Sequence, residues 1–146
     1  MNQQAACIFC RIERGDAPCA LVYRDDRVLA FMDIQPVTRG HTLIVTREHF
    51  ENVYDVSEQA LVAVASLSRR LATAIREVIA PEGLRVVQLN GAAAGQTVFH
   101  YHMHLIPRTA GEPDRFHGRV TADSAELAAV AVQLEAALER STVQSA

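Results

Sequence analysis

The chain has 146 residues, of which 49% are hydrophobic and 21% are charged, and its formal net charge is -3. This length and apolar content predict one domain with a buried core, while the charge argues against tight binding of duplex nucleic acid by phosphate neutralisation. No apolar run approaches the length that spans a bilayer, and the first residues lack a basic start followed by an apolar signal core, so we expect a cytoplasmic protein.

The segment before residue 50 predicts a short helix and three strands. Residues 8–13 carry a helical pattern, and Gly15 would end that helix as a C-terminal cap. Asp25, Asp26 and Arg27 separate two apolar runs, which predicts a hairpin turn between them. The strands are expected at residues 21–24, 28–32 and 41–46, the last of them directly after Gly40.

The remaining sequence predicts a long helix, two more strands and a last helix. Apolar residues recur at helical spacing over residues 57–80, and Pro81 and Gly83 follow as stop signals. Asp123, with Glu126 three residues later, resembles a capping box that opens a helix. The strands are expected at 85–89 and 99–107, and the last helix is expected to run to about Arg140.

This order of strands, long helix, strands and helix predicts an α+β fold, because the strands cluster on both sides of one helix. We expect a five-stranded antiparallel sheet with a long central helix and shorter terminal helices. The chain contains no repeat, low-complexity block or linker that would divide it. A single domain over residues 1–146 is therefore expected, with its core at about 7–110 and a C-terminal tail and helix at 111–146.

Three histidines, His100, His102 and His104, alternate along the last predicted strand. Side chains on a strand point to opposite faces with a period of two, so these three share one face while Tyr101 and Met103 share the other. Three imidazoles spaced about 7 Å apart suit neither a core nor an idle surface. The pattern predicts that one face of this strand packs and the other carries chemistry.

The loop before the histidines, residues 90–97, is small and polar. Gly91 and Gly95 would let the backbone approach a ligand closely, and the side chains of Gln96 and Thr97 can donate hydrogen bonds to phosphate oxygens. The alternative is an ordinary turn between two strands, in which glycine and asparagine serve only the backbone geometry.

The three cysteines, Cys7, Cys10 and Cys19, are an odd number without a secretion signal, which argues against a disulfide scaffold. A redox pair at Cys7 and Cys10 is disfavoured because no strand precedes it. The C-x-x-C spacing can supply two of the four ligands that a zinc site needs, and histidines are available to complete it.

These motifs together resemble the histidine triad (HIT) family. The resemblance covers Asn90–Arg108, read as NGAAAGQTVFHYHMHLIPR, and Phe31–Val45, read as FMDIQPVTRGHTLIV. The opening CIFCRIERGDAPCALVYRDD is similar to that of bacterial, zinc-containing members. About the first 110 residues match in order and spacing.

The resemblance implies an enzyme that splits a bond at the α-phosphorus of a purine nucleotide derivative. By position, His102 would be the nucleophile and would form a covalent nucleotidyl-histidine that water hydrolyses. His104 would contact the phosphate or protonate the leaving group, and His41 would orient the nucleophile. Gln96 and Thr97 would bind the phosphate oxygens.

The resemblance also implies a nucleoside site and a structural zinc site. Asp33 would accept hydrogen bonds from the ribose, Asn90 would bind near the ribose or phosphate, and the base would lie in a slot formed by Phe9, Ile12, Phe31 and Ile34. The zinc ligands would be Cys7, Cys10, His49 and His100, unless His100 stays metal-free within the triad. The family forms two-fold homodimers, which the sequence does not itself show.

Three functions stay open at this point. The first is hydrolysis or transfer with phosphoramidates or adenylates of AMP or GMP, the second is hydrolysis of dinucleoside polyphosphates, and the third is non-catalytic binding of purine nucleotides. The lack of a basic cluster near the site favours the first over the second. Arg108, Arg115 and Arg119 could reverse that preference if the tail folds over the site.

Overall fold

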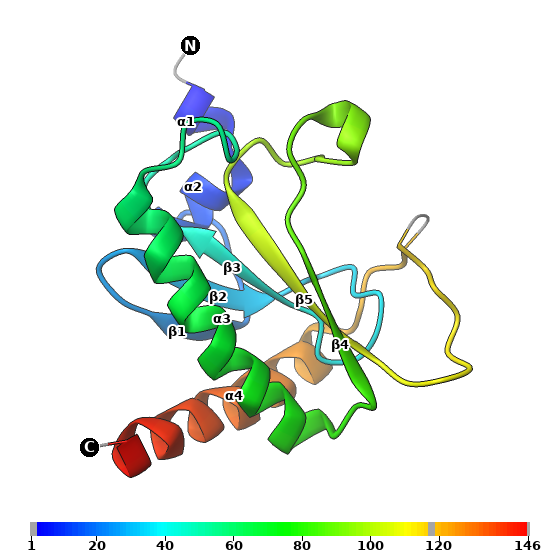
Figure 1. The fold of residues 1–146 in the computed structure, drawn as a ribbon. Coiled ribbons are helices and arrows are strands. Elements are labelled where there is room, and N and C mark those ends of the chain that lie inside the picture. Colours follow the sequence, from blue (N-terminus) through cyan, green and yellow to red (C-terminus); the bar gives the residue numbers. More distant parts are fainter. Residues whose placement is uncertain (1–2, 117–118, 146) are drawn as a thin grey trace.

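The computed structural model describes residues 3–116 and 119–145, which form an α+β fold (Figure 1). A short 3₁₀ turn lies at Ala92–Ala94, between the last two strands. The elements in chain order are α1 (Gln3–Ala6), α2 (Ile8–Arg14), β1 (Leu21–Arg24), β2 (Val28–Met32), β3 (Thr42–Thr46), α3 (Glu58–Ile79), β4 (Gly83–Val87), β5 (His102–Arg108) and α4 (Ser124–Ser145).

The five strands form one antiparallel sheet, as predicted, and their order in it is β1-β2-β3-β5-β4. Strand β5 therefore lies between β3 and the edge strand β4. In the β3–β5 register, Leu43 lies opposite His104 and Val45 lies opposite His102. The histidines are thus in the interior of the sheet, where neighbouring strands fix their backbone.

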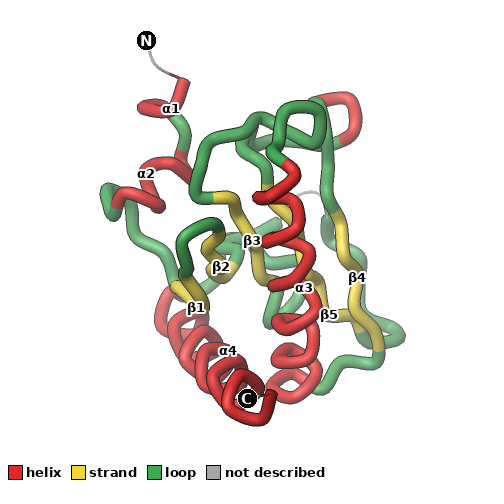
Figure 2. Tube along the Cα trace, turned by 60° about the vertical axis from the view of Figure 1, so that its left-hand side comes forward, coloured by secondary structure: helices red, strands yellow, loops and turns green. Residues whose placement is uncertain are grey.

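Helices cover both faces of the sheet. On one face, α3 and α4 pack on a core that includes Ile44 and Leu105, and Figures 1 and 2 both show these two helices on the same side of the strands. On the other face, Phe9 of α2 packs with Phe31 and Val45 in a smaller cluster. All residues of β2 and β3 are buried as a result.

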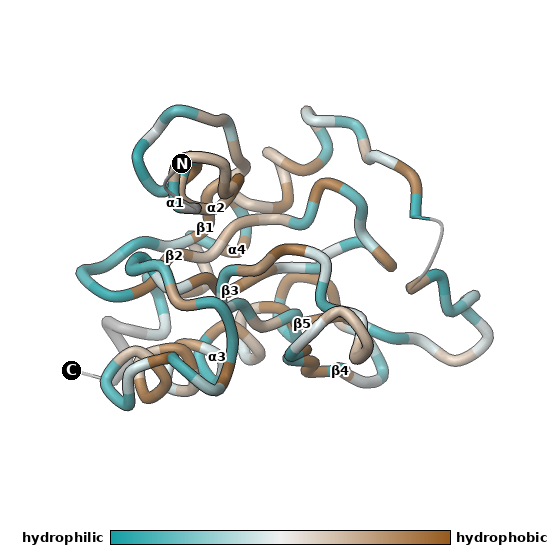
Figure 3. The backbone as a smooth tube through the Cα atoms, turned by 90° about the horizontal axis from the view of Figure 1, so that it is seen from above, coloured by the Kyte–Doolittle hydropathy of each residue, from teal (hydrophilic) through white to brown (hydrophobic). Residues whose placement is uncertain are grey.

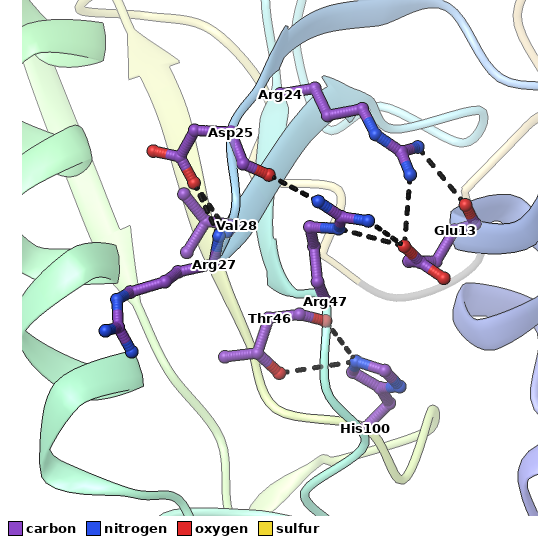
Figure 4. Close-up of polar contacts among 8 residues, drawn as sticks. All are labelled: Glu13, Arg24, Asp25, Arg27, Val28, Thr46, Arg47 and His100. Carbon is purple, nitrogen blue, oxygen red and sulfur yellow. Dashed lines mark hydrogen bonds and ion pairs between the residues drawn. The ribbon is translucent and has the colours of Figure 1, made fainter.

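Local signals account for the ends of the long helix and for the first hairpin. The Ser57 hydroxyl accepts a hydrogen bond from the Ala60 N–H at 3.1 Å and caps α3, and the chain leaves the helix at Ala80 with φ 53°. In the hairpin, the Asp25 carboxylate accepts the backbone N–H groups of Arg27 and Val28, and Figure 4 shows the bond to Val28. The predicted long helix and the predicted hairpin turn are both confirmed.

Gly40 occupies a position that only glycine fits without strain. Its φ is +93°, and an added Cβ would lie 2.8 Å from Cγ1 of Ile79 and 3.2 Å from Cγ of Pro107. The turn before β3 is therefore held closely against α3 and β5, which fixes the backbone that leads into His41.

The predicted bounds of two strands and the predicted length of the last helix were wrong. Strand β5 begins at His102, because the Tyr101 N–H donates to the carbonyl of Phe50 in a loop instead of to a neighbouring strand. His100 therefore lies before the strand. Strand β4 ends at Val87, because the side-chain amides of Gln88 and Asn90 bond to each other and begin a loop. The C-terminal helix is 22 residues long, the same as α3, so it is not a shorter terminal helix.

Hydropathy follows this architecture. In Figure 3 the hydrophobic stretches lie along strands and helices, and hydrophilic stretches gather in the connecting loops. Within residues 3–116 and 119–145, none of the helices combines the length and the apolar character that crossing a membrane requires.

Candidate functional site

The histidine face is formed by β5 and covered by α2. His102 and His104 lie on the same side as Phe9, while Met103 and Leu105 pack on the opposite side with α3 and α4. The Phe9 ring meets the His102 ring edge-on at 5.0 Å between centroids, and the rings of His102 and His104 are also 5.0 Å apart. The predicted alternation is confirmed for these two histidines.

A backbone carbonyl defines the tautomer of His102. Its Nδ1 lies 2.6 Å from the carbonyl oxygen of His100, so Nδ1 carries the proton and donates to that oxygen. In the neutral ring, Nε2 then has a free lone pair. His102 therefore presents a nucleophilic nitrogen on the ring edge that faces away from its own backbone.

A second chain of hydrogen bonds defines His41 and His104. The Val37 N–H donates to Nδ1 of His41 at 3.0 Å, so the proton of neutral His41 resides on Nε2. This Nε2 lies 2.9 Å from Nδ1 of His104, which accepts the bond. The proton of neutral His104 is consequently on Nε2, where it can be donated to a ligand.

Burial keeps these imidazoles neutral. It lowers the pKa of His41 to about 3 and that of His104 to about 3, with smaller effects from neighbouring charges. Burial also lowers the pKa of His102, although the bond to the His100 carbonyl and the Asp33 carboxylate oppose this shift. A neutral imidazole is the form that can act as a nucleophile.

The Asp33 carboxylate lies at the end of the same network. Its Oδ2 is 3.4 Å from Nε2 of His41 and 4.0 Å from Nδ1 of His104, and its Oδ1 accepts the Gln35 N–H at 2.8 Å. Asp33, His41 and His104 lie close enough together to hold a metal ion. However, Nδ1 of His41 accepts the Val37 N–H, so the proton of neutral His41 is on Nε2, the atom that would have to bind the metal. The cluster is better suited to hydrogen bonding than to holding a cation.

Four residues predicted as zinc ligands come together at the N-terminal end of β5. Sγ of Cys10 lies 3.2 Å from Nδ1 of His49 and 3.5 Å from Nδ1 of His100, and Sγ of Cys7 lies 3.4 Å from the same His100 atom. The two Nδ1 atoms are 3.1 Å apart. Tetrahedral zinc with ordinary bond lengths would separate such donors by about 3.3 to 3.6 Å, so the set fits that ion.

The chemistry of the donors agrees with this geometry. Nε2 of His100 donates to the Thr46 carbonyl at 2.6 Å (Figure 4), which leaves the Nδ1 lone pair directed at the cysteines. Burial, followed by the effect of Cys7, raises the pKa of the Cys10 thiol to about 11, so a thiolate here needs a nearby cation. Among the described residues, Cys19 lies outside this group.

A salt-bridge clamp, which the sequence did not predict, positions α2 over the strands. Figure 4 shows Glu13 of α2 between two arginines: Arg24 of β1 donates to its carboxylate at 3.1 Å, and Arg47 after β3 at 2.9 Å. The clamp holds Cys10, which is on the same helix, near His49 and His100. The partners are 11 and 34 residues away, so no local pattern indicates them.

The loop at 90–97 does not meet the prediction for Gln96. Its side-chain N–H groups donate to the carbonyls of Glu51 and Val98, and its oxygen accepts the Gly91 N–H, so no side-chain N–H remains for a phosphate oxygen. Asn90 is similarly engaged, because its Oδ1 accepts the N–H of Val53. These two side chains brace the loop.

The rest of this loop lies toward the predicted metal ligands. Thr97 is exposed and lines a cavity of about 570 Å³ together with Cys7 and His49. Gly95 adopts φ +98° and lies near Leu89. Among the described residues, no hydrogen bond joins Gln96 or Thr97 to His102 or His104.

The residues predicted to form the base slot are mostly packed together. The rings of Phe9 and Phe31 are buried and meet edge-on at 5.5 Å, and Ile12 packs beside them. Ile34 is 58% exposed at the rim, where its carbonyl accepts the Ala122 N–H at 2.9 Å. Phe9 and Phe31 therefore form an apolar wall on the same side of the sheet as His102.

The segment after β5 comes back beside the β2–β3 loop (Figure 1), where the Ala122 N–H donates to the Ile34 carbonyl. The Phe116 ring lies 5.8 Å from the His104 ring, and the Arg119 guanidinium lies 3.1 Å from Oδ2 of Asp33. Arg108 instead donates to the carbonyls of Glu112 and Pro113. Of the three tail arginines that the sequence left open, Arg119 is therefore the one that reaches Asp33, and the contact of Phe116 had no sequence signal.

Comparisons with known proteins show which proteins this sequence and fold are similar to. The HIT domain family model matches residues 14–111. Protein hit from Bacillus subtilis (strain 168) is 49% identical over 75% of each chain, and Adenylylsulfatase HINT3 from Arabidopsis thaliana is 36% identical over 72% of this chain and 53% of that protein. The crystal structure of a Zn-bound histidine triad family protein from Mycobacterium smegmatis has a TM-score of 0.84 at 34% identity, over 97% of this chain and 99% of that one.

Proposed function

Because this chain belongs to the HIT domain family, we propose that it is a hydrolase that cleaves nucleoside phosphoramidates or related adenylates at the α-phosphorus through a covalent nucleotidyl-histidine. The observation that carries the proposal is the 2.6 Å bond from Nδ1 of His102 to the His100 carbonyl, which leaves Nε2 with its lone pair. The relative named Adenylylsulfatase HINT3 supports adenylates as one substrate class.

In the first step, Nε2 of His102 attacks the α-phosphorus, and the bond from phosphorus to the leaving group breaks with its electron pair on the leaving group. The ring becomes positively charged as the P–N bond forms, and the His100 carbonyl stabilises that charge through Nδ1–H. His104 donates from Nε2–H to the phosphate or the departing atom. Its orientation depends on His41, which donates to its Nδ1.

In the second step, water attacks the same phosphorus and the P–N bond breaks, which returns the electron pair to Nε2 of His102. The leaving group takes its proton in the first step from Nε2–H of His104, and the attacking water returns a proton to that nitrogen in the second step, so that water supplies in net both the oxygen that ends on phosphorus and the proton that ends on the leaving group. The buried, neutral imidazoles suit both steps, because neither begins by removing a proton from His102.

The nucleoside is held by Asp33 and by the apolar wall. We assign the ribose hydroxyls to the Asp33 carboxylate, which lies 4.0 Å from His104, and the purine to the wall of Phe9 and Phe31 with Ile34 at its rim. Gln96 and Asn90 contribute by bracing the loop, and we keep the Thr97 hydroxyl and the backbone near Gly95 as the proposed phosphate donors of this loop.

We also assign a structural zinc ion to Cys7, Cys10, His49 and His100. Two cysteines and two histidines close a tetrahedral site without an open position, so the ion would supply cross-linking and no catalytic water. It would join α2 to the chain that enters β5. The Zn-bound relative from Mycobacterium smegmatis supports this assignment.

A two-fold homodimer completes the proposal. Val62 on α3 and Val86 on the edge strand β4 are 61% and 51% exposed, and an edge strand with exposed apolar residues needs cover. Light scattering after gel filtration tests this, because a mass of one chain would contradict it.

The function is tested with adenosine 5′-phosphoramidate and the purified protein. We expect release of AMP under multiple-turnover conditions, and a nucleotidyl adduct on the intact protein when the reaction is quenched early. Absence of both turnover and adduct, in protein that binds AMP, would leave only a nucleotide-binding role.

A further inference from the structure

The ion pair between Arg119 and Asp33 brings a cation to the proposed active site. Nη1 of Arg119 lies 3.1 Å from Oδ2 of Asp33, and the Arg119 side chain is only 17% exposed. A guanidinium presents five N–H donors in a fixed plane, so one contact with Asp33 leaves others directed elsewhere.

Neighbouring contacts fix where this guanidinium lies. Arg119 packs over the Phe116 ring at 5.4 Å, and the same ring lies 5.8 Å from that of His104. The Asp33 oxygen that Arg119 contacts is also the one nearest to His41 and His104. Arg119 and His104 therefore flank one carboxylate oxygen.

This arrangement has a consequence for a bound nucleotide. If ribose hydroxyls take Asp33 as their acceptor, they compete with Arg119 for Oδ2. A partly desolvated guanidinium that loses its carboxylate partner requires another anion. The nearest available one is the negatively charged part of the substrate, because the phosphorus must lie beside His102 and His104.

We propose that Arg119 is a specificity-determining residue that contacts the substrate and favours nucleotides whose leaving group on the α-phosphorus is anionic, such as sulfate or phosphate, over those with a neutral amine. This inference rests on the proposed hydrolase function and ranks its substrates by the charge of the leaving group. The other tail arginines do not offer the same contact, since Arg108 is bound to the carbonyls of Glu112 and Pro113 and Arg115 is exposed.

The test compares two substrates that differ only in the leaving group, adenosine 5′-phosphosulfate and adenosine 5′-phosphoramidate. For each protein, the ratio of the two kcat/KM values is measured, so that a partly unfolded preparation affects both values equally. In Arg119→Gln, we expect the ratio of phosphosulfate to phosphoramidate to fall by about tenfold to hundredfold, the effect of losing a hydrogen bond between charged groups.

Two further variants make the result specific. Arg119→Lys keeps the charge and should recover part of the ratio, whereas Arg115→Gln removes an exposed charge from the same segment and should change the ratio less than twofold. An Arg119→Gln ratio within twofold of the unmodified protein, or above it, would overturn the inference while the hydrolase function stands.

If the unmodified protein hydrolyses neither substrate, the proposed function fails and the contact is judged by binding alone. Calorimetry then compares the affinities for ADP and AMP. Arg119→Gln should weaken ADP binding at least fivefold more than AMP binding, and equal weakening of both would reject the contact.

Discussion

Nδ1 of His102 donates a hydrogen bond to the carbonyl oxygen of His100 over 2.6 Å, and the His100 ring is itself one of the four converging sulfur and nitrogen donors. The residue that defines the tautomer of the proposed nucleophile is therefore also the residue that the proposed zinc ion would hold. Metal binding, the position of α2 and the reactivity of His102 should depend on one another.

Loss of a zinc ligand should therefore affect both stability and activity. We expect purified protein to contain about one zinc per chain, and Cys10→Ala to lose most of the metal, to melt at a lower temperature and to have reduced kcat. The matched control is Cys19→Ala, a cysteine outside the donor cluster, which should keep its zinc. Metal analysis that finds no zinc in protein prepared without chelators would contradict the assignment.

His104 should contribute less than His102. His104→Gln removes the ring that donates to the phosphate or leaving group, and a hydrogen-bond or proton donor of this kind is worth about 10²- to 10⁴-fold in rate. We expect kcat for the phosphoramidate to fall near the lower end of that range while AMP binding changes little. An unchanged kcat would show that the His41 and His104 pair is only structural.

Gly40 should be intolerant of a side chain. Gly40→Ala must adopt φ near +93° and place a methyl group 2.8 Å from Ile79, so we expect a loss of about 1 to 3 kcal/mol in the free energy of unfolding. Gly83→Ala is the matched control, because nothing lies within 4 Å of its added Cβ and its φ is not positive. Equal denaturation midpoints for the two variants would refute this reading of the turn.

Stability should fall as the pH is lowered from about 6.5 toward 3. The folded-state pKa values of His41 and His104, each about 3, lie below the ordinary value of 6.5. In this window the unfolded chain binds more protons than the folded one, so each such histidine weakens folding by about 1.4 kcal/mol per pH unit. The full stability is present above pH 6.5.

The pH effect is measured as the slope of the free energy of unfolding against pH, because a general loss of stability lowers that free energy at every pH without changing the slope. Urea titrations at several pH values between 6 and 4 should give a shallower slope for His104→Asn than for the unmodified protein, because one buried neutral imidazole is gone. Zinc ligands also bind protons in this range, but they are the same in both proteins. Parallel slopes would argue against a neutral, buried His104.

Local patterns predicted the parts of the fold that local physics determines. The alternation of His102 and His104 follows from the pleat of a strand, and the long helix follows from apolar residues at helical spacing with Pro81 and Gly83 after them. Contacts over long sequence distances were not predictable in this way. The sequence did not indicate that Glu13 pairs with Arg24 and Arg47. It also did not indicate that the Phe116 ring lies beside the His104 ring.

Gln96 shows how such a distant contact reverses a local prediction. As a polar residue in a glycine-rich loop it suited phosphate binding, but the carbonyl of Glu51, 45 residues earlier in the chain, takes one of its two side-chain N–H groups. Arg119 is the opposite case, because the sequence allowed it to reach the site and tertiary structure brings it to Asp33.

The most direct test of the account is the turnover and nucleotide affinity of His102→Ala. Because Nε2 of His102 forms the covalent bond, we predict that kcat for adenosine 5′-phosphoramidate falls by on the order of 10⁴-fold or more, that no nucleotidyl adduct forms, and that the Kd for AMP stays within about threefold. Hydrolysis at a near-normal rate by His102→Ala, or an adduct that persists on another residue, would contradict the proposed mechanism.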